Sequence, residues 1–180
     1  MFKDVELKIK KRNQILFSRD SLCLQDLSAL ISDQTHRTLV MWALNCGNIV
    51  VDEIEQKYPY ETRPKNALEL CKLWARGEVK MPAAKRAILD CHAAAKELSD
   101  PAYSALCHAV GHAGASVHVE THAIGLPIYE LTAIVIKNCY KDYENDVTKK
   151  IDFYIQRLIY WQKNIGNINM KWAGFLKDDN

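Results

Sequence analysis

The sequence contains little of what marks secreted, membrane-bound or disulfide-rich proteins. No apolar run approaches the length that a bilayer-spanning helix needs, and charged residues follow Lys3 and Asp4 where a signal peptide would have its apolar segment. No Cys-x-x-Cys pair occurs, which argues against a zinc ribbon or a thioredoxin-type site. We therefore expect a cytoplasmic protein whose six cysteines are free thiols.

The short motifs of the common enzyme classes are absent as well. The chain has no G-x-S-x-G sequence, no phosphate-binding loop and no G-x-G-x-x-G sequence. A net charge of +2 creates no strong field toward nucleic acid or an acidic membrane surface. The sequence thus predicts no cofactor, no nucleic-acid partner and no membrane partner.

What the chain does contain is typical of one folded domain. It has 180 residues, of which 48% are hydrophobic and 26% are charged. We expect a mainly α, single-domain multi-helix bundle over residues 1–180. The predicted parts are a β-hairpin or edge element over 1–20, a helical body over 21–165 and a tail over 166–180.

The hairpin prediction depends on the first residues. Val5, Leu7 and Ile9 alternate with charged residues, and a polar turn precedes a second short apolar segment. Alternation of this kind is typical of paired strands. A helix over the same residues is the alternative.

Apolar residues recur at helical spacing through the rest of the chain. Helix start and stop signals predict helices over about 21–31, from 33 or 35 to just before Tyr58, over 62–77 and over 82–98. After the central stretch, a further helix should run to about Cys139 and a last one over about 145–164.

The stretch from Pro101 to Tyr129 contains a single charged residue, Glu120. Asp100 followed by proline is a helix start. A helix without a polar face is usually buried on all sides. We therefore expect a central buried helix over about 101–123, with a break between 118 and 127 where a glycine and a proline occur.

Four histidines lie in this stretch, at His108, His112, His118 and His122. If the helix is unbroken, they share a sector of about 120°. Two pairs spaced by four residues could ligate a metal together, with His92 as a further ligand. The Glu that follows the first His in the metalloprotease motif is missing, so hydrogen bonding within a small-residue core, or along a groove, is the favoured interpretation.

A different set of residues suits protein recognition, because aromatic and arginine side chains anchor interfaces. Tyr58, Tyr60 and Arg63 belong to one predicted loop, and Arg76 ends the next helix. Together with His112, His118 and His122, they are the candidate binding residues.

A series of local motifs occurs in order between residues 33 and 165. They are Trp42-Ala43-Leu44-Asn45-Cys46, Lys57-Tyr58-Pro59, Arg63-Pro64 with Ala67, Trp74-Ala75-Arg76-Gly77-Glu78, His92-Ala93-Ala94-Ala95, Asp100-Pro101-Ala102, Gly111-His112-Ala113, His118-Val119, Thr121-His122-Ala123, Tyr129 and Trp161-Gln162. In this order, the set resembles the all-helical immunity protein family of bacterial polymorphic toxin systems.

The resemblance implies a cytoplasmic helical protein that binds and blocks a cognate toxin and catalyses nothing. The net charge does not predict the acidic surface with which inhibitors of nucleases often meet a basic partner. Two alternatives stay open. One is a metal-binding helical bundle or metal-dependent enzyme that uses His108, His112, His118 and His122, and the other is a structural oligomer such as a homodimer.

Overall fold

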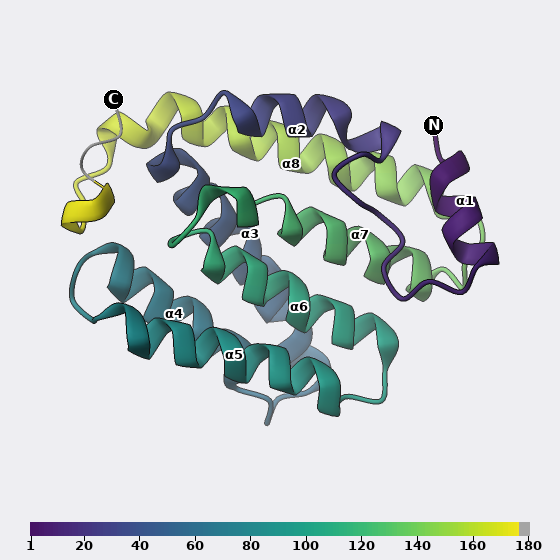
Figure 1. Cartoon of the computed structure of the whole chain (residues 1–180), viewed down its shortest axis with the longest axis horizontal. Coiled ribbons are helices and arrows are strands. Elements are labelled where there is room, and N and C mark those ends of the chain that lie inside the picture. The colour runs from purple at the N-terminus through teal and green to yellow at the C-terminus, as the bar shows by residue number, and fades with distance from the viewer. Residues whose placement is uncertain (177–180) are drawn as a thin grey trace.

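The chain folds around one helix, α6, which other helices surround. The computed structural model describes residues 1–176 (Figure 1). Within these residues the α-helices are α1 (Lys3–Lys10), α2 (Gln25–Ser32), α3 (His36–Lys57), α4 (Arg63–Ala75), α5 (Met81–Glu97), α6 (Pro101–Ala115), α7 (Gly125–Lys137) and α8 (Glu144–Asn164). Four short 3-10 helices complete them: η1 (Leu22–Leu24), η2 (Glu120–His122), η3 (Ile165–Asn167) and η4 (Gly174–Leu176).

The start of α6 is fixed by its sequence. The Asp100 side chain accepts hydrogen bonds from the backbone N–H groups of Ala102 and Tyr103 at 3.0 and 3.3 Å. Pro101 occupies the first helical position, where its missing N–H group does no harm. Because small and apolar residues follow on every side, α6 packs against α3, α4, α5 and α7 at once. The prediction of a central buried helix is confirmed.

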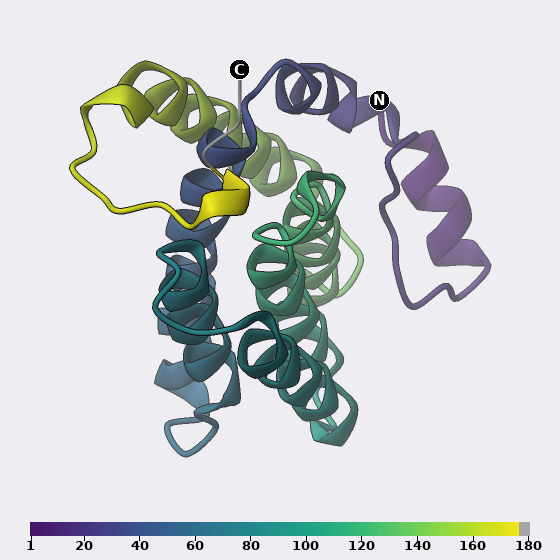
Figure 2. The ribbon, with the colours of Figure 1, turned by 60° about the vertical axis from the view of Figure 1, so that its left-hand side comes forward.

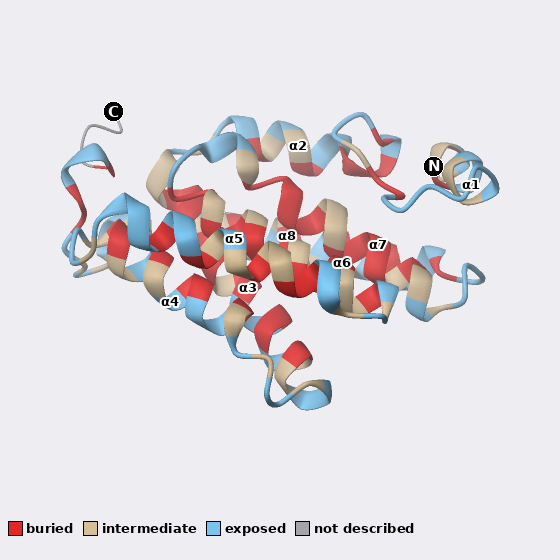
Figure 3. Cartoon of the chain, turned by 60° about the horizontal axis from the view of Figure 1, so that its bottom comes forward, coloured by how far each residue is buried: buried red, intermediate tan, exposed pale blue. Residues whose placement is uncertain are grey.

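The remaining helices form a second layer over this core. Helix α8 lies along α3 and α7, and α2 lies along α8 (Figures 1 and 2). Buried positions gather on α6 and on the sides of α3 and α7 that face it (Figure 3). The prediction of a mainly α, multi-helix bundle is confirmed, and no strand occurs within residues 1–176.

The predicted N-terminal β-hairpin is wrong. Residues Lys3–Lys10 form α1, in which Val5 is fully buried and Leu7 is 56% exposed. The helix has acidic residues in its first turn and lysines in its last, which suits the helix dipole. A two-stranded hairpin alone is marginally stable, whereas α1 needs only one apolar stripe to pack on the body.

A segment without helix or strand follows α1. Arg12 adopts a left-handed conformation with φ of 56° and turns the chain back. Leu16 and Phe17 are then buried, and the backbone N–H of Leu16 donates to Thr132 Oγ1 on α7 at 3.1 Å. Leu16 and Phe17 therefore belong to the core without forming a strand.

The end of the central helix also differs from the prediction of about residue 123. Helix α6 ends at Ala115, and Ser116 Oγ donates to the carbonyl of Ala113 at 2.6 Å. A turn and η2 follow before α7 begins at Gly125. Pro127 lies in the first turn of α7, where proline is tolerated, so the proline belongs to the new helix and the break lies upstream of it.

One buried polar network ties the two layers together. Glu130 on α7 is 4% exposed and accepts a hydrogen bond from the hydroxyl of Tyr154 on α8, which is fully buried. Lys150 Nζ lies 2.6 Å from the other Glu130 carboxylate oxygen. Trp42 on α3 donates its indole N–H to the Tyr154 carbonyl at 3.0 Å. The network thus joins α3, α7 and α8.

The C-terminal segment returns to the far end of the bundle from α1 (Figure 1). The backbone N–H of Ala173 donates to the carbonyl of Ala75 at 2.8 Å, and the Phe175 ring lies 5.3 Å from that of Trp74. Within residues 1–176, none of the helices has both the length and the hydrophobicity to cross a bilayer.

Candidate functional site

Four imidazoles and one phenol meet where α5, α6 and α7 pack together. His92 comes from α5, His108 and His112 come from successive turns of α6, His122 from η2 and Tyr129 from α7. We call these five residues the histidine cluster. It lies between helices because the spacing of four residues on α6 places His108 and His112 on one face.

The members of the cluster are in direct contact. The Nδ1 atoms of His92 and His108 are 2.8 Å apart, which is a hydrogen-bonding distance. The His112 ring stacks on Tyr129 with centroids 5.1 Å apart and lies 5.6 Å from the His122 ring. The cluster is therefore one continuous set of rings.

Two glycines make room for these rings. A Cβ atom at Gly111 would lie 2.5 Å from Cε1 of His92, and one at Gly125 would lie 2.4 Å from Nδ1 of His112. Both distances are far below van der Waals contact. Glycine is therefore required at the two positions as long as the rings keep their places.

The cluster favours neutral imidazoles. Burial, followed by the charge of His108, lowers the pKa of His92 to about 4. Burial, followed by the charge of His92, lowers the pKa of His112 to about 4. Burial also lowers the pKa of His108 and His122, with Lys96 and Arg19 respectively as the next cause. At neutral pH the rings are uncharged and can pair through one N–H and one lone pair.

The arrangement has few of the features of a catalytic centre. No carboxylate within residues 1–176 orients these rings by a hydrogen bond, and the buried Nδ1 of His112 has no partner there. The described residues contain no group of three or more His, Cys, Asp or Glu side chains that could hold a metal ion. Hydrogen bonding and packing are what the geometry supports.

The cysteines next to the histidines also act structurally. Cys91 Sγ lies 3.1 Å from the carbonyl of Cys107, and both thiols are buried. Burial raises the pKa of Cys107 to about 12 and raises that of Cys91 as well. Neither forms a thiolate at neutral pH, so neither is a nucleophile.

The structure divides the predicted binding residues among three places. His112 and His122 are in the histidine cluster. The exposed His118 instead lies against Trp74, with ring centroids 5.8 Å apart, at the end of α4 where Arg76 is also found. The four histidines therefore do not share one helix face, because the helix ends before the last two.

Tyr58, Tyr60 and Arg63 lie at the opposite end of α4. The Tyr58 ring meets that of Tyr103 edge to face at 5.2 Å, and Tyr60 is 96% exposed. Arg63 is held by Glu61 at 2.6 Å and by Glu97 at 2.7 Å. This end of α4 therefore combines an aromatic surface, formed by Tyr58 and Tyr60, with an arginine that two glutamates hold in place.

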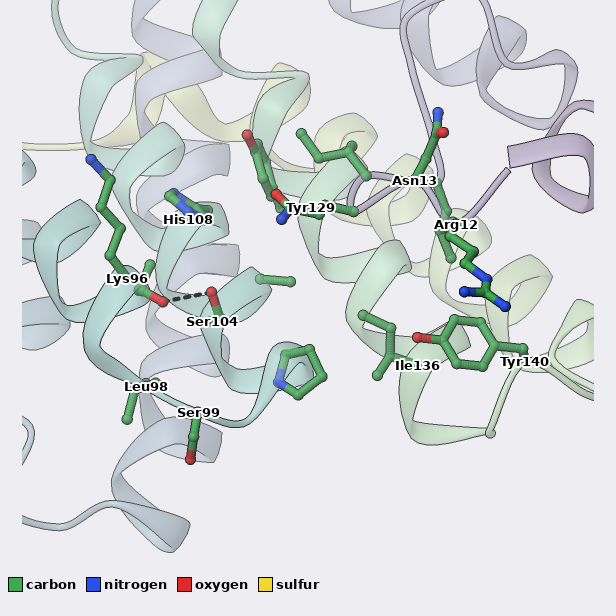
Figure 4. Close-up of a pocket in the computed structure, with 16 residues that line it drawn as sticks. Arg12, Asn13, Lys96, Leu98, Ser99, Ser104, His108, Tyr129, Ile136 and Tyr140 are labelled. Atoms are coloured by element: carbon green, nitrogen blue, oxygen red, sulfur yellow. Dashed lines mark hydrogen bonds between the residues drawn. The ribbon is translucent and has the colours of Figure 1, made fainter. Parts of the chain in front are cut away.

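A cavity of about 590 Å³ adjoins the histidine cluster and the turn from α5 to α6 (Figure 4). Its walls are residues 12–16, the end of α5 with the turn to α6, the first half of α6, and Tyr129, Ile136 and Tyr140 on and after α7. His108 and Tyr129 of the cluster form part of its lining. We call it the α5–α7 cavity.

Sequence patterns alone missed three of these features. Tyr129 was singled out only as one of the ordered motifs, and His92 was given a site role only as an additional metal ligand. The cavity joins segments that are about eighty residues apart in the chain, so no local pattern reveals it. The sequence signal for the cluster was the four-residue spacing of His108 and His112, which places both rings on one helix face.

Replacing Gly111 by alanine tests the packing of the cluster. We expect Gly111→Ala to destabilise the protein by about 1–3 kcal/mol, because the new methyl group collides with the His92 ring. Adding His92→Ala should remove the collision, so the two changes should couple in a double-mutant cycle by about 0.5–3 kcal/mol. Urea unfolding measures both. Gly166→Ala is the control, since its Cβ meets nothing within 4 Å. Additive effects of the two changes would contradict the contact.

Comparison with known protein families identifies a match. The family model described as Imm-5 like putative immunity protein matches residues 29–157, which is well over half of the chain. No curated protein and no solved structure matches. The matched residues run from α2 into α8 and include the whole histidine cluster. The chain therefore belongs to the Imm-5 like putative immunity protein family.

Proposed function

We propose that this protein is a cytoplasmic immunity protein that binds and neutralises a cognate bacterial toxin without catalysing a reaction. The observation that carries the proposal is the family match over residues 29–157. The fold agrees with such a role, because a bundle packed around a buried helix offers a preformed surface to a partner.

The chemistry of the described residues supports a non-catalytic role. His92 and His112 have a pKa near 4, so they are poor proton acceptors at neutral pH. Cys91 and Cys107 are protonated and buried. Side chains that only contact a toxin and fix its position need neither to accept protons nor to form a thiolate.

We further propose that the toxin binds at the end of the bundle that carries Tyr58, Tyr60 and Arg63. Lys57 Nζ pairs there with Asp100 at 2.7 Å, which fixes the α3–α4 loop to the turn between α5 and α6. The same turn borders the α5–α7 cavity. An aromatic surface and a cavity therefore adjoin, which is a common arrangement of an interface anchor and its neighbouring pocket. Arg76 and His118 lie at the other end of α4 and are outside this face.

Co-expression with the toxin domain encoded by the neighbouring gene tests the proposal. We expect that domain to stop growth of the host cells when it is expressed alone. Co-expression of this protein should restore growth, and the two chains should co-purify. A toxin domain from an unrelated system is the control and should be neither bound nor neutralised. A neighbouring product that is harmless alone, or that fails to bind, would contradict the proposal.

A further inference from the structure

The α5–α7 cavity is lined by positively charged side chains and by no negatively charged ones. Its lining includes the cations Arg12 and Lys96 and the hydrogen-bonding side chains of Asn13, Ser99 and Tyr140. No aspartate or glutamate is among the residues that line it. A cavity of this composition attracts negative charge.

Its two cations have no acidic partner within residues 1–176. The ion pairs of the described residues engage other lysines and arginines, on α3, α4, α5, α7 and α8. Arg12 and Lys96 are both exposed, in contrast to the half-buried Arg63 that two glutamates hold. They are therefore free to pair with a ligand.

Arg12 is kept in a backbone conformation that favours glycine. It follows α1 with φ of 56°, and its backbone N–H donates to the carbonyl of Ile9 at 2.9 Å. Helix α4 ends in the same way, but there the residue is Gly77, with φ of 74°. An arginine where glycine fits better indicates a use for its side chain.

Tyr140, which also lines the cavity, shows the same feature. Its φ is 63°, it is 47% exposed, and it follows the end of α7. Within residues 1–176 the non-glycine residues with positive φ are Arg12, Cys139, Tyr140 and Asp142. Two of them thus carry exposed side chains of the cavity wall.

The cavity wall next to Arg12 also has backbone N–H groups that make no hydrogen bond within residues 1–176. The N–H groups of Gln14 and Ile15 donate to no acceptor within residues 1–176, and both residues are exposed. A polypeptide that lies along this wall can accept these hydrogen bonds. A single small ion would leave them unused.

The cations also lie apart. Lys96 lies on the side of the cavity formed by α5, with its ammonium directed outward and away from Arg12, and Arg12 lies beside Tyr140 on the opposite side (Figure 4). One small anion cannot pair with both, whereas an extended segment with two or more carboxylates can. We propose that the α5–α7 cavity binds an acidic, extended segment of the toxin. This inference rests on the proposed function and adds the chemistry of the partner.

Charge reversal tests the inference. The variant Arg12→Glu/Lys96→Glu is compared with Lys85→Glu/Lys149→Glu, which makes the same charge change at two exposed lysines outside the cavity. Calorimetric titration with the toxin domain should show at least about 30-fold weaker binding for the cavity variant. The control variant should stay within about threefold of the wild type, and higher salt should weaken wild-type binding. If the wild type binds and the cavity variant matches it, the inference is wrong while the proposed function stands. A wild type that does not bind contradicts the proposed function.

A glycine substitution separates recognition from folding. Arg12→Gly should leave the unfolding midpoint unchanged or raise it by up to about 3 °C, because glycine prefers this conformation. The same variant should weaken toxin binding by at least about fivefold. If Arg12 has a structural role instead, Arg12→Gly should lower both the unfolding midpoint and the affinity for the toxin, which would overturn the inference.

Two small probes test the cavity without the toxin. A hexaglutamate peptide should bind the wild type at low salt and lose this binding in Arg12→Glu/Lys96→Glu, even if the neighbouring toxin proves not to be the partner. Inorganic phosphate should compete only weakly. Phosphate that binds more tightly than the peptide, and that loses binding in the same variant, would show a small-anion site and overturn the inference.

Discussion

Replacing Glu130 by alanine should lower the free energy of unfolding by about 3–5 kcal/mol. The carboxylate is 4% exposed and has two partners, the Lys150 ammonium at 2.6 Å and the hydroxyl of the fully buried Tyr154. The substitution leaves the hydroxyl of the fully buried Tyr154 without an acceptor and removes the carboxylate that pairs with Lys150, whose side chain is only 20% exposed. Denaturant unfolding followed by circular dichroism measures the loss.

The loss of unfolding free energy in Glu130→Ala should arise from the burial of this ion pair, and an exposed ion pair should contribute much less. Lys65→Ala, which breaks the more exposed pair with Glu55 at 3.1 Å, is the matched control and should cost less than about 1 kcal/mol. Lys150→Met alone should cost more than the double variant Glu130→Gln/Lys150→Met, because the single variant leaves a buried charge unpaired. A loss below about 1 kcal/mol in Glu130→Ala would contradict the role of this network.

Acidification should lower the free energy of unfolding already at pH values well above those at which carboxylates titrate. The pKa of His92 and of His112 is about 4 in the folded protein, whereas an imidazole in the unfolded chain has a pKa near 6.5. Below pH 6.5 the unfolded chain therefore binds more protons than the folded one, and stability falls as pH falls toward 4. Above pH 6.5 these groups add no pH dependence.

The expected loss between pH 7 and pH 5 is about 1–3 kcal/mol, after allowance for the partial solvent contact of the rings. Urea unfolding at constant ionic strength measures it. The variant His92→Asn/His112→Gln should have a flatter profile over the same range. A wild-type profile that is flat between pH 7 and pH 5 would show that the cluster is not desolvated.

Much of the helical architecture follows from local sequence signals. Thr35 caps the N-terminus of α3 and accepts a hydrogen bond from the Thr38 N–H at 3.3 Å, and Gly77 follows the end of α4 in a left-handed conformation. Residues of these types predicted the helix bounds from α3 to α5 and for α8 closely. The assignment of residues 1–180 to a single domain stays a prediction.

The two errors arose where local patterns allow two structures. Val5 and Ile9 alternate with charged residues, but they are also four residues apart and share one face of α1. The central helix was predicted to run to about residue 123, but it ends at Ala115, and Pro127 lies in the first turn of the next helix. In both cases the packing of distant segments decided between the patterns.

The site was predictable only in part for the same reason. His108 and His112 share a helix face, as their spacing requires, and they do so in the structure. Tyr129 and the cavity wall around Arg12 come from segments whose proximity is set by the packing of α5, α6 and α7. Glu130 carried a signal that is easy to overlook, since it is the one acidic residue in the apolar sequence of α7.

Stoichiometric titration of purified toxin with this protein, followed by native mass spectrometry, tests the central claim most directly. Non-catalytic neutralisation predicts that toxin activity falls in proportion to the protein added, through a complex of fixed composition. Toxin recovered from that complex under denaturing conditions should have an unchanged mass and regain activity on refolding. Loss of toxin activity at far less than one equivalent, with a changed toxin mass, would contradict the account and identify an enzyme.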